Sequence, residues 1–207
     1  MDAALSAGAD LVGLVFFPPS PRAVTPLGGA DLAAVARGRA AVTALLVDAE
    51  DEFIRDVVSR VNPDFLQLHG VETPQRVAEI RACFGKPVMK ALAISSAGDL
   101  AGVSAYEAVA DRVLYDAKPP KDADRPGGHG RVFDWNLLAE VSRKKPMMLS
   151  GGLNPDNVAD AIRAVRPDGV DVSSGVEDAP GVKSTAKISS FVMNARAAAQ
   201  ALQEKVS

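Results

Sequence analysis

The sequence predicts an α/β protein whose residues 1–207 form a single (β/α)8 TIM barrel. Three observations support this fold class. The length of 207 residues lies at the lower end of the range for one such barrel. Short apolar runs alternate with segments of helical period along the chain. Glycine-rich turns follow the last two of these runs, which is where barrels of this class bind phosphate.

Seven apolar runs are the predicted strands. Most are rich in Val, Leu or Ile and are apolar on both faces, as parallel strands covered by helices are. The spacing between their starts leaves room for one helix and two short turns each time. The runs are 9–17, 41–48, 64–69, 87–94, 112–116, 146–149 and 169–173.

The segments between the runs carry helix signals. Apolar residues at 53, 54, 57, 58 and 61 fall on one helical face, and those at 158, 161, 162 and 165 repeat the pattern. Thr73-Pro74 predicts an N-cap followed by proline at the first helical position, and Asn154-Pro155 predicts the same.

This alternation alone leaves two architectures, an open doubly wound sheet and a closed barrel. A dinucleotide-binding open sheet usually has its glycine-rich loop after the first strand, so the late glycine turns favour the barrel. Only seven strands are visible, and residues 2–7 read as the end of a helix that leads into the first of them. We therefore expect the first strand of the barrel to be missing from the printed chain, through a misplaced start codon or a truncation.

Composition excludes several classes of protein. A net charge of −3 and a pI of about 5.4 argue against a broad basic face for nucleic acid. No apolar run approaches the roughly 20 residues that span a bilayer. A single cysteine and two histidines argue against an internal disulfide and against a Cys- or His-based metal site. We expect a cytoplasmic protein with no metal, nucleic-acid or membrane partner, as a monomer or homodimer.

Two turns are candidates for phosphate binding. One contains Gly151 and Gly152, and the other contains Ser173, Ser174 and Gly175. Glycine lets backbone N–H groups approach an anion without obstruction by Cβ. One Gly-Gly turn is equally well a simple tight turn, but two such turns after the last two strands favour a phosphate site.

Asp116 and Arg22 are candidate polar groups at the ends of predicted strands. A carboxylate at the C-terminal end of a barrel strand faces the active-site mouth, so Asp116 is a candidate general acid. The alternative for Asp116 is a helix cap or a surface ion pair. Arg22 follows the first strand in a proline-rich loop, and its guanidinium is placed to fork onto a carboxylate or phosphate. The alternative for Arg22 is a solvated surface side chain.

His69 and Asp171 are further candidates near strand ends. By strand alternation Gln67 and His69 point the same way and are predicted to line the pocket. A hydrogen-bonded structural histidine is an equal alternative, and Asp171 has a similar status. Cys83 lies between a predicted helix and the strand at 87–94, away from the active-site loops, so we expect a buried structural thiol there.

Several segments in order along essentially the whole chain carry a resemblance to a known family. They are 13–17 through 20–22, 66–70, 114–116, 127–130 with 133–135, 150–153 with 157–158, and 169–177. Together they resemble the phosphoribosylanthranilate isomerases of tryptophan biosynthesis. The run Gly-Val-Asp-Val-Ser-Ser-Gly-Val-Glu is highly specific for that family. The resemblance implies an aldose–ketose isomerase of TIM-barrel fold that uses no cofactor.

The resemblance also implies a reaction and residue roles. The substrate N-(5-phosphoribosyl)anthranilate undergoes an Amadori rearrangement to 1-(2-carboxyphenylamino)-1-deoxyribulose 5-phosphate. Asp116 matches the general acid that protonates the ring oxygen, and Arg22 matches the arginine that meets the anthranilate end. The two glycine turns match the phosphate site.

One feature departs from the family pattern. The family's general base is a cysteine in a Lys-x-Cys-Gly motif on the first strand, which this sequence does not contain, and Cys83 does not match it. Two alternatives therefore stay open. One is a catalytically impaired phosphate-binding barrel, and the other is a different phosphosugar isomerase or epimerase barrel.

Overall fold

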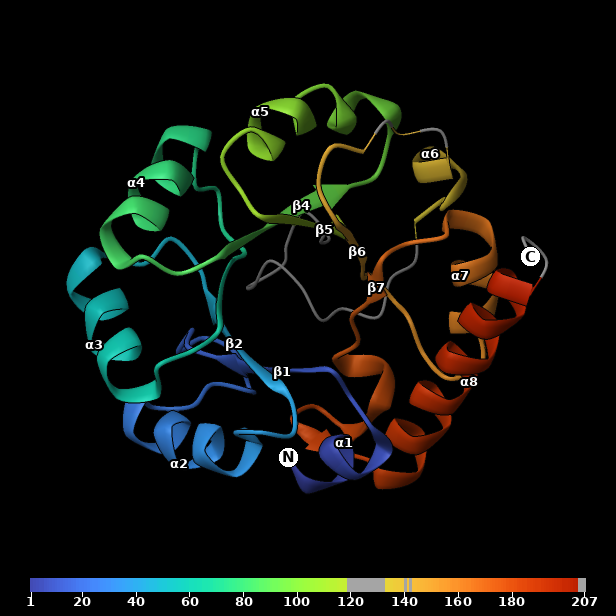
Figure 1. The fold of residues 1–207 in the computed structure, drawn as a ribbon, viewed down its shortest axis with the longest axis horizontal. Coiled ribbons are helices and arrows are strands. Elements are labelled where there is room, and N and C mark those ends of the chain that lie inside the picture. The colour runs from blue at the N-terminus through green and yellow to red at the C-terminus, as the bar shows by residue number, and fades with distance from the viewer. Residues whose placement is uncertain (119–132, 140, 142, 205–207) are drawn as a thin grey trace.

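The computed structural model describes residues 1–118, 133–139, 141 and 143–204. In this part of the chain seven parallel strands form one curled sheet in the order β1-β2-β3-β4-β5-β6-β7. Figure 1 shows the strands at the centre and the helices in a ring around them. A doubly wound sheet reverses its strand order partway, so the consecutive order excludes that architecture and confirms the barrel type.

The strands are short, and each lies inside a predicted apolar run or extends one residue beyond it. They are β1 (Leu11–Val15), β2 (Ala41–Leu46), β3 (Phe65–Leu68), β4 (Val88–Ile94), β5 (Arg112–Ala117), β6 (Met147–Leu149) and β7 (Gly169–Val170). The last strand is the least accurate prediction, because its ladder ends at Val170 and not at residue 173. A small antiparallel hairpin, β8 (Glu177–Ala179) with β9 (Val182–Lys183), was not predicted.

Helices cover the outer face of the sheet. They are α1 (Asp2–Ala7), α2 (Pro26–Ala36), α3 (Asp51–Val61), α4 (Pro74–Phe84), α5 (Val103–Glu107), α6 (Asn136–Ala139), α7 (Val158–Val165) and α8 (Thr185–Glu204), with 3-10 turns η1 (Ala97–Leu100) and η2 (Ser174–Val176). The Thr73 hydroxyl caps α4 by accepting from Arg76 N at 3.2 Å, as predicted. None of the helices in the described ranges is long and apolar enough to cross a membrane.

The start of α7 and the burial of Cys83 differ from prediction. Helix α7 begins at Val158, because the Asn154 side chain accepts from the backbone N–H groups of residues 156 and 157 and holds a turn there instead. Cys83 lies at the end of α4, as expected, but it is exposed. Val77 and Ile80 are the buried residues of that helix, and Cys83 is not among them.

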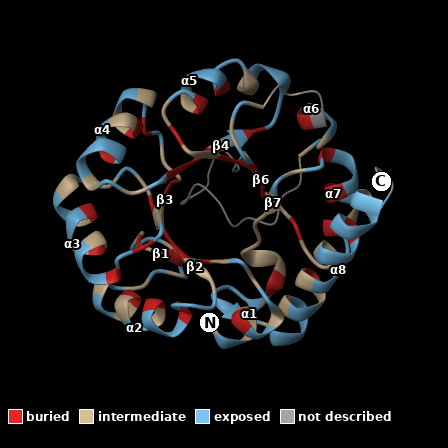
Figure 2. Cartoon of the chain, viewed as in Figure 1, coloured by how far each residue is buried: buried red, intermediate tan, exposed pale blue. Residues whose placement is uncertain are grey.

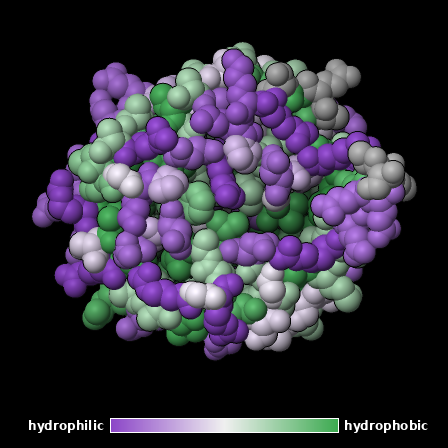
Figure 3. Space-filling view, viewed as in Figure 1, coloured by the Kyte–Doolittle hydropathy of each residue, from purple (hydrophilic) through white to green (hydrophobic). Residues whose placement is uncertain are grey.

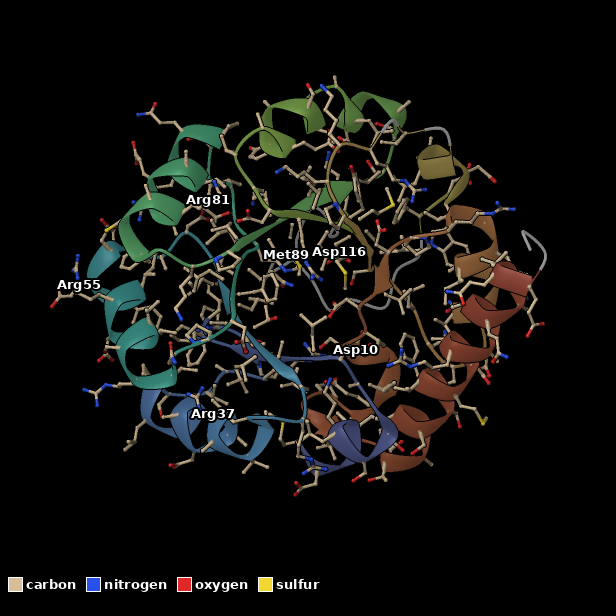
Figure 4. All side chains as sticks on the ribbon, viewed as in Figure 1. Asp10, Arg37, Arg55, Arg81, Met89 and Asp116 are labelled. Carbon is tan, nitrogen blue, oxygen red and sulfur yellow. The ribbon has the colours of Figure 1, made fainter. Side chains whose placement is uncertain are left out.

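Alternate strand residues divide the core into two parts. Those that point outward pack between sheet and helices, and those that point inward fill the interior of the curled sheet. Figure 2 shows buried residues along the strands and on the helix faces that look toward them. The inward set includes a small apolar cluster of Met89, Ala91, Leu114 and Met148. In Figure 4 the Met89 side chain lies near the centre of the ring.

Strands β1 and β7 are the two ends of the sheet. The ladders of the described residues join neighbours from β1 to β7 but do not join β1 to β7. Helix α1 packs against α8 outside the gap between β1 and β7. Arg196 on α8 donates to the Gly8 carbonyl at 2.9 Å and pairs with Asp10 at 2.8 Å, which ties the two ends of the chain together.

Candidate active site

Polar side chains gather at the C-terminal ends of the central strands. His69 directly follows β3, Asp116 belongs to β5, Ser150 directly follows β6, and Asp171 directly follows β7. Because the strands are parallel, these ends share one mouth of the sheet. Figure 4 shows Asp116 directed toward the centre of the ring, beside Met89. Figure 3 shows the other end of the sheet, at the N-terminal ends of the strands, where hydrophilic residues crowd the rim and hydrophobic residues show in the hollowed middle.

His69 and Asp116 form the pair at the centre of this group. His69 Nε2 lies 3.1 Å from Asp116 Oδ2, and the two side chains are only 12% and 9% exposed. The other carboxyl oxygen of Asp116 accepts from the backbone N–H of Ala117 at 2.8 Å. The carboxyl group is therefore held at both oxygens, with one of them facing the imidazole.

Gln67 fixes the other side of the imidazole. Its Oε1 lies 3.2 Å from His69 Nδ1, and its amide nitrogen faces the Met89 sulfur at 3.4 Å. The imidazole therefore lies between a side-chain amide and a carboxyl group, and its tautomer sets which ring nitrogen donates. A hydrogen bond between Nε2 and Asp116 Oδ2 needs one proton between these two atoms. The pair is thus built to hold a transferable proton at the mouth of the sheet.

Asp171 is a second carboxyl group near this pair. Its Oδ2 accepts from Ser150 Oγ at 3.1 Å. Burial raises the pKa of Asp171, and the negative charge of Asp116 raises it further, while the Ser150 hydrogen bond and His69 act in the opposite direction. Two carboxyl groups therefore face the same interior, and the ionisation of one opposes that of the other.

The two glycine turns lie next to each other and next to Asp116. A Cβ added to Gly175 would lie 1.8 Å from the carbonyl oxygen of Leu153, which directly follows the Gly151-Gly152 turn. Gly151 has a φ of 89°, and an added Cβ there would lie 2.5 Å from Ala117 N. Both glycines therefore lie where chain segments approach too closely for a side chain. Ser173 is held by Lys183, whose Nζ donates to the Ser173 carbonyl at 2.8 Å.

Arg22 is positioned by a carboxylate of the protein itself. Its Nε and Nη2 each donate to a different oxygen of Glu177 at 2.7 Å, and the two side chains are 11% and 4% exposed. The backbone supports this placement, since Val24 N donates to the carbonyl of Val15 at the end of β1. Burial alone would raise the pKa of Glu177, but hydrogen bonds from Arg22 and Lys183 outweigh it and lower the pKa to about 2. Arg22 therefore does bind a carboxylate through two parallel hydrogen bonds, as predicted, but this carboxylate belongs to Glu177 of the same chain.

Sequence reasoning found part of this constellation. It identified the strand ends at which His69, Asp116 and Asp171 lie, and it predicted that Gln67 and His69 point the same way. It missed two partners, Glu177 of Arg22 and Ser150 of Asp171, although both lie in segments that it singled out. His129 and the glycines at 127, 128 and 130 lie outside the described residues. In the described ranges, no three His, Cys, Asp or Glu side chains are grouped as metal ligands.

Comparisons with known proteins agree with this architecture. The family model described as N-(5'-phosphoribosyl)anthranilate (PRA) isomerase matches residues 1–194. The N-(5'-phosphoribosyl)anthranilate isomerase of Rhodopseudomonas palustris (strain BisA53) is 58% identical over 95% of this chain and 90% of its own length. The crystal structure of phosphoribosyl anthranilate isomerase from Thermotoga maritima has a TM-score of 0.85 at 37% identity, covering 94% of this chain and 92% of that one.

A further solved structure of the same enzyme contains a ligand. It is a phosphoribosyl anthranilate isomerase in complex with reduced 1-(o-carboxyphenylamino)-1-deoxyribulose 5-phosphate. It has a TM-score of 0.80 at 34% identity and covers 94% of this chain and 91% of that one. The matched family model, these similarities and the shared fold together show that this chain belongs to the N-(5'-phosphoribosyl)anthranilate isomerase family.

Proposed function

We propose that this chain catalyses the isomerisation of N-(5'-phosphoribosyl)anthranilate to 1-(2-carboxyphenylamino)-1-deoxyribulose 5-phosphate. The observation that carries the proposal is the His69–Asp116 pair, enclosed at the mouth of the sheet beside the two glycine turns. The reaction needs an acid at the ring oxygen of the sugar. It also needs a fixed place for the phosphate, so that the ring oxygen lies at that acid.

Asp116 is the proposed general acid. The proton that it shares with His69 is transferred to the furanose ring oxygen, the ring C–O bond breaks, and the amine nitrogen supplies its lone pair to form the Schiff base. Before this transfer the shared proton joins Asp116 to His69 Nε2 and so holds the carboxyl group in place, while Gln67 fixes the imidazole at Nδ1. A general acid placed in this way contributes on the order of 10²–10⁴-fold in rate.

The proposed phosphate site is formed by the turns around Gly151, Gly152 and 173–175. Backbone N–H groups in such turns bind anions, and Lys183 adds a positive charge at Ser173. Arg22 is proposed to meet the carboxyphenyl end. Its Nε–Nη2 edge is occupied by Glu177, so the Nη1 side and the flat face of the guanidinium are what it offers to a ligand.

The base that removes the C2 proton comes from the resemblance. It is the cysteine of a Lys-x-Cys-Gly motif on the first strand of the family, and this sequence contains no such motif. We propose that activity needs a strand carrying that motif beside the described sheet, in the cytoplasm where a thiol stays reduced. Without it, the rate is expected to be lower by about 10²–10⁴-fold.

The test follows the loss of substrate fluorescence. It is run on the printed chain and on the chain preceded by a strand that contains the motif. We expect the longer chain to turn over substrate, and Asp116→Asn in that chain to lower turnover by about 10²–10⁴-fold with little change in substrate binding. The asparagine keeps the shape of the side chain but cannot donate the acidic proton. Normal turnover by Asp116→Asn, or no turnover by the longer chain, contradicts the proposal.

A further inference from the structure

A buried ion pair lies behind the proposed site, on the outer face of the sheet. Lys90 lies in the middle of β4, an otherwise apolar strand, and points away from the interior that Met89 faces. Its Nζ lies 2.7 Å from Glu72 Oε2, and both side chains are only 2% exposed. None of the proposed catalytic steps uses either residue.

Both members of the pair are fully engaged with the loop between β3 and α4. Lys90 Nζ donates to the carbonyl oxygens of Leu68 and Gly70 at 3.1 and 2.7 Å, in addition to Glu72. Its three N–H donors are therefore all used. Glu72 in turn accepts from the backbone N–H of Gly70 at 3.0 Å and of Asp48 at 2.9 Å.

These contacts surround a single residue of the loop. The two carbonyls bound by Lys90 belong to Leu68 and Gly70, the neighbours of His69 on either side. The backbone N–H of His69 itself donates to the Leu46 carbonyl at 2.9 Å. The loop is also closely packed at Gly70, because a Cβ added there would lie 2.4 Å from the Asp48 carboxylate. The backbone at His69 is thus fixed from both sides.

Stability alone does not explain this arrangement. Desolvation of two charges offsets much of their attraction, and well-packed apolar side chains often replace a buried ion pair without loss of stability. An ion pair does provide directional bonds to backbone carbonyls and N–H groups, which apolar side chains lack.

We propose that Lys90 and Glu72 are positioning residues for the reaction. They fix the backbone on both sides of His69, and His69 in turn holds the acidic carboxyl of Asp116 at 3.1 Å. A displacement of about 1 Å in such a group can lower a rate by about 10²-fold. The kinetic part of this inference rests on the proposed function, but the structural part does not.

The decisive variant removes both charges together. Lys90→Met alone leaves Glu72 charged and unpaired in the interior, and such a protein is expected to fold poorly. The double variant Glu72→Leu/Lys90→Met keeps the pocket apolar and filled. Val77→Ala is the matched control, because it removes buried atoms from α4, the helix that follows the same loop, and leaves both members of the ion pair in place.

Nitrogen NMR of labelled histidine reads out the position of His69 without reference to catalysis. The chain has only two histidines, so His129→Gln leaves the ring signals of His69 alone. The fixed partners at Nδ1 and Nε2 predict one dominant tautomer, in which the two ring nitrogens give distinct signals. We expect the double variant to lose this distinction between the two nitrogens and Val77→Ala to keep it. If the folded double variant gives the same spectrum as the parent, the proposal is wrong.

Kinetics on the catalytically competent chain supply the second readout. We expect the double variant to lower kcat by about 10- to 100-fold with KM changed less than about threefold, and Val77→Ala to change neither. An unchanged kcat in the double variant overturns the positioning role. If the longer chain that carries the Lys-x-Cys-Gly motif is itself inactive, the proposed function fails, and the NMR experiment still decides whether the pair positions His69.

Discussion

Replacing Glu177 by glutamine tests how firmly the loop that carries Arg22 is held. The substitution keeps the size of the side chain but removes the negative charge to which Arg22 donates two hydrogen bonds, each 2.7 Å long. In the native protein the pKa of Glu177 falls from 4.5 to about 2, in spite of burial, because Arg22 and Lys183 donate to the carboxylate. A shift of that size corresponds to about 3 kcal/mol of free energy of unfolding at neutral pH.

The pH dependence has a defined sign. The folded pKa lies below the unfolded value, so the stabilisation is fully present above about pH 4.5 and is lost as the pH falls toward 2. We therefore expect Glu177→Gln to unfold about 3 kcal/mol more easily than the parent at pH 7. At pH 3.5 the Glu177 carboxyl of the unfolded parent is mostly protonated, so the difference in unfolding free energy between parent and variant is smaller by roughly one third to one half.

Urea unfolding followed by circular dichroism at pH 7, 5 and 3.5 measures this difference. Asp178→Asn is the matched control, because Asp178 is the next residue along the chain and also forms an ion pair, with Lys187, but its side chain is 60% exposed. We expect the control to match the parent at every pH. Equal losses in both variants, or a loss in Glu177→Gln that does not change with pH, would refute the assignment of the stabilisation to the buried Arg22–Glu177 pair.

Three further predictions concern Asp171, Gly151 and Cys83. The pKa of Asp171 is raised in the folded protein, so ionisation of this carboxyl group costs stability as the pH rises above 3.8, its ordinary pKa. In urea unfolding, Asp171→Asn should therefore become progressively more stable than the parent between pH 4 and 7. The reverse trend would count against this prediction. Gly151 has a φ of 89° and no room for a Cβ beside Ala117, so Gly151→Ala should lower stability by about 2 kcal/mol and weaken phosphate binding measured by calorimetry. Cys83 is exposed at the end of the barrel opposite the site, so alkylation of its thiol should leave the activity of the longer, catalytically competent chain unchanged. In this experiment bound product protects the cysteine of the added strand, so that the reagent reacts with Cys83.

Most of the fold follows from local patterns in the sequence. The periodicity of residues 53–61 predicts the buried face of α3, where Ile54, Val57 and Val61 are buried. The Thr73-Pro74 pair predicts the start of α4, because a hydroxyl cap and a proline act within one turn. The start of α7 escaped this reasoning, since Asn154 can cap a helix or close a turn, and the contact of Asn157 Nδ2 with the Gly152 carbonyl at 3.0 Å holds the turn.

The partners of the site residues were harder to predict, because they depend on contacts between distant segments. Arg22 and Glu177 are 155 positions apart, and nothing local to either residue identifies the other. The sequence does carry a signal for the Lys90–Glu72 ion pair, since Lys90 is a charged residue inside an apolar strand. Fully buried lysine is rare unless it is paired, so a lysine at that position predicts a partner even where the sequence does not say which residue it is.

Each proposed catalytic or binding group is held in place by further side chains. Asp116 is held by His69, which is held by Gln67, while Lys90 and Glu72 fix the backbone at His69; Arg22 is held in the same way by Glu177. Most of these supports come from strands or loops other than those of the groups they hold. The exceptions are Gln67, on the strand that precedes His69, and Glu72, in the same loop as His69. Because a side chain at a strand end is fixed by its own strand only at the backbone, such supports are what set the direction of its polar atoms. Substitutions in the supports are therefore expected to lower turnover, in addition to the losses of stability predicted above for the two buried ion pairs.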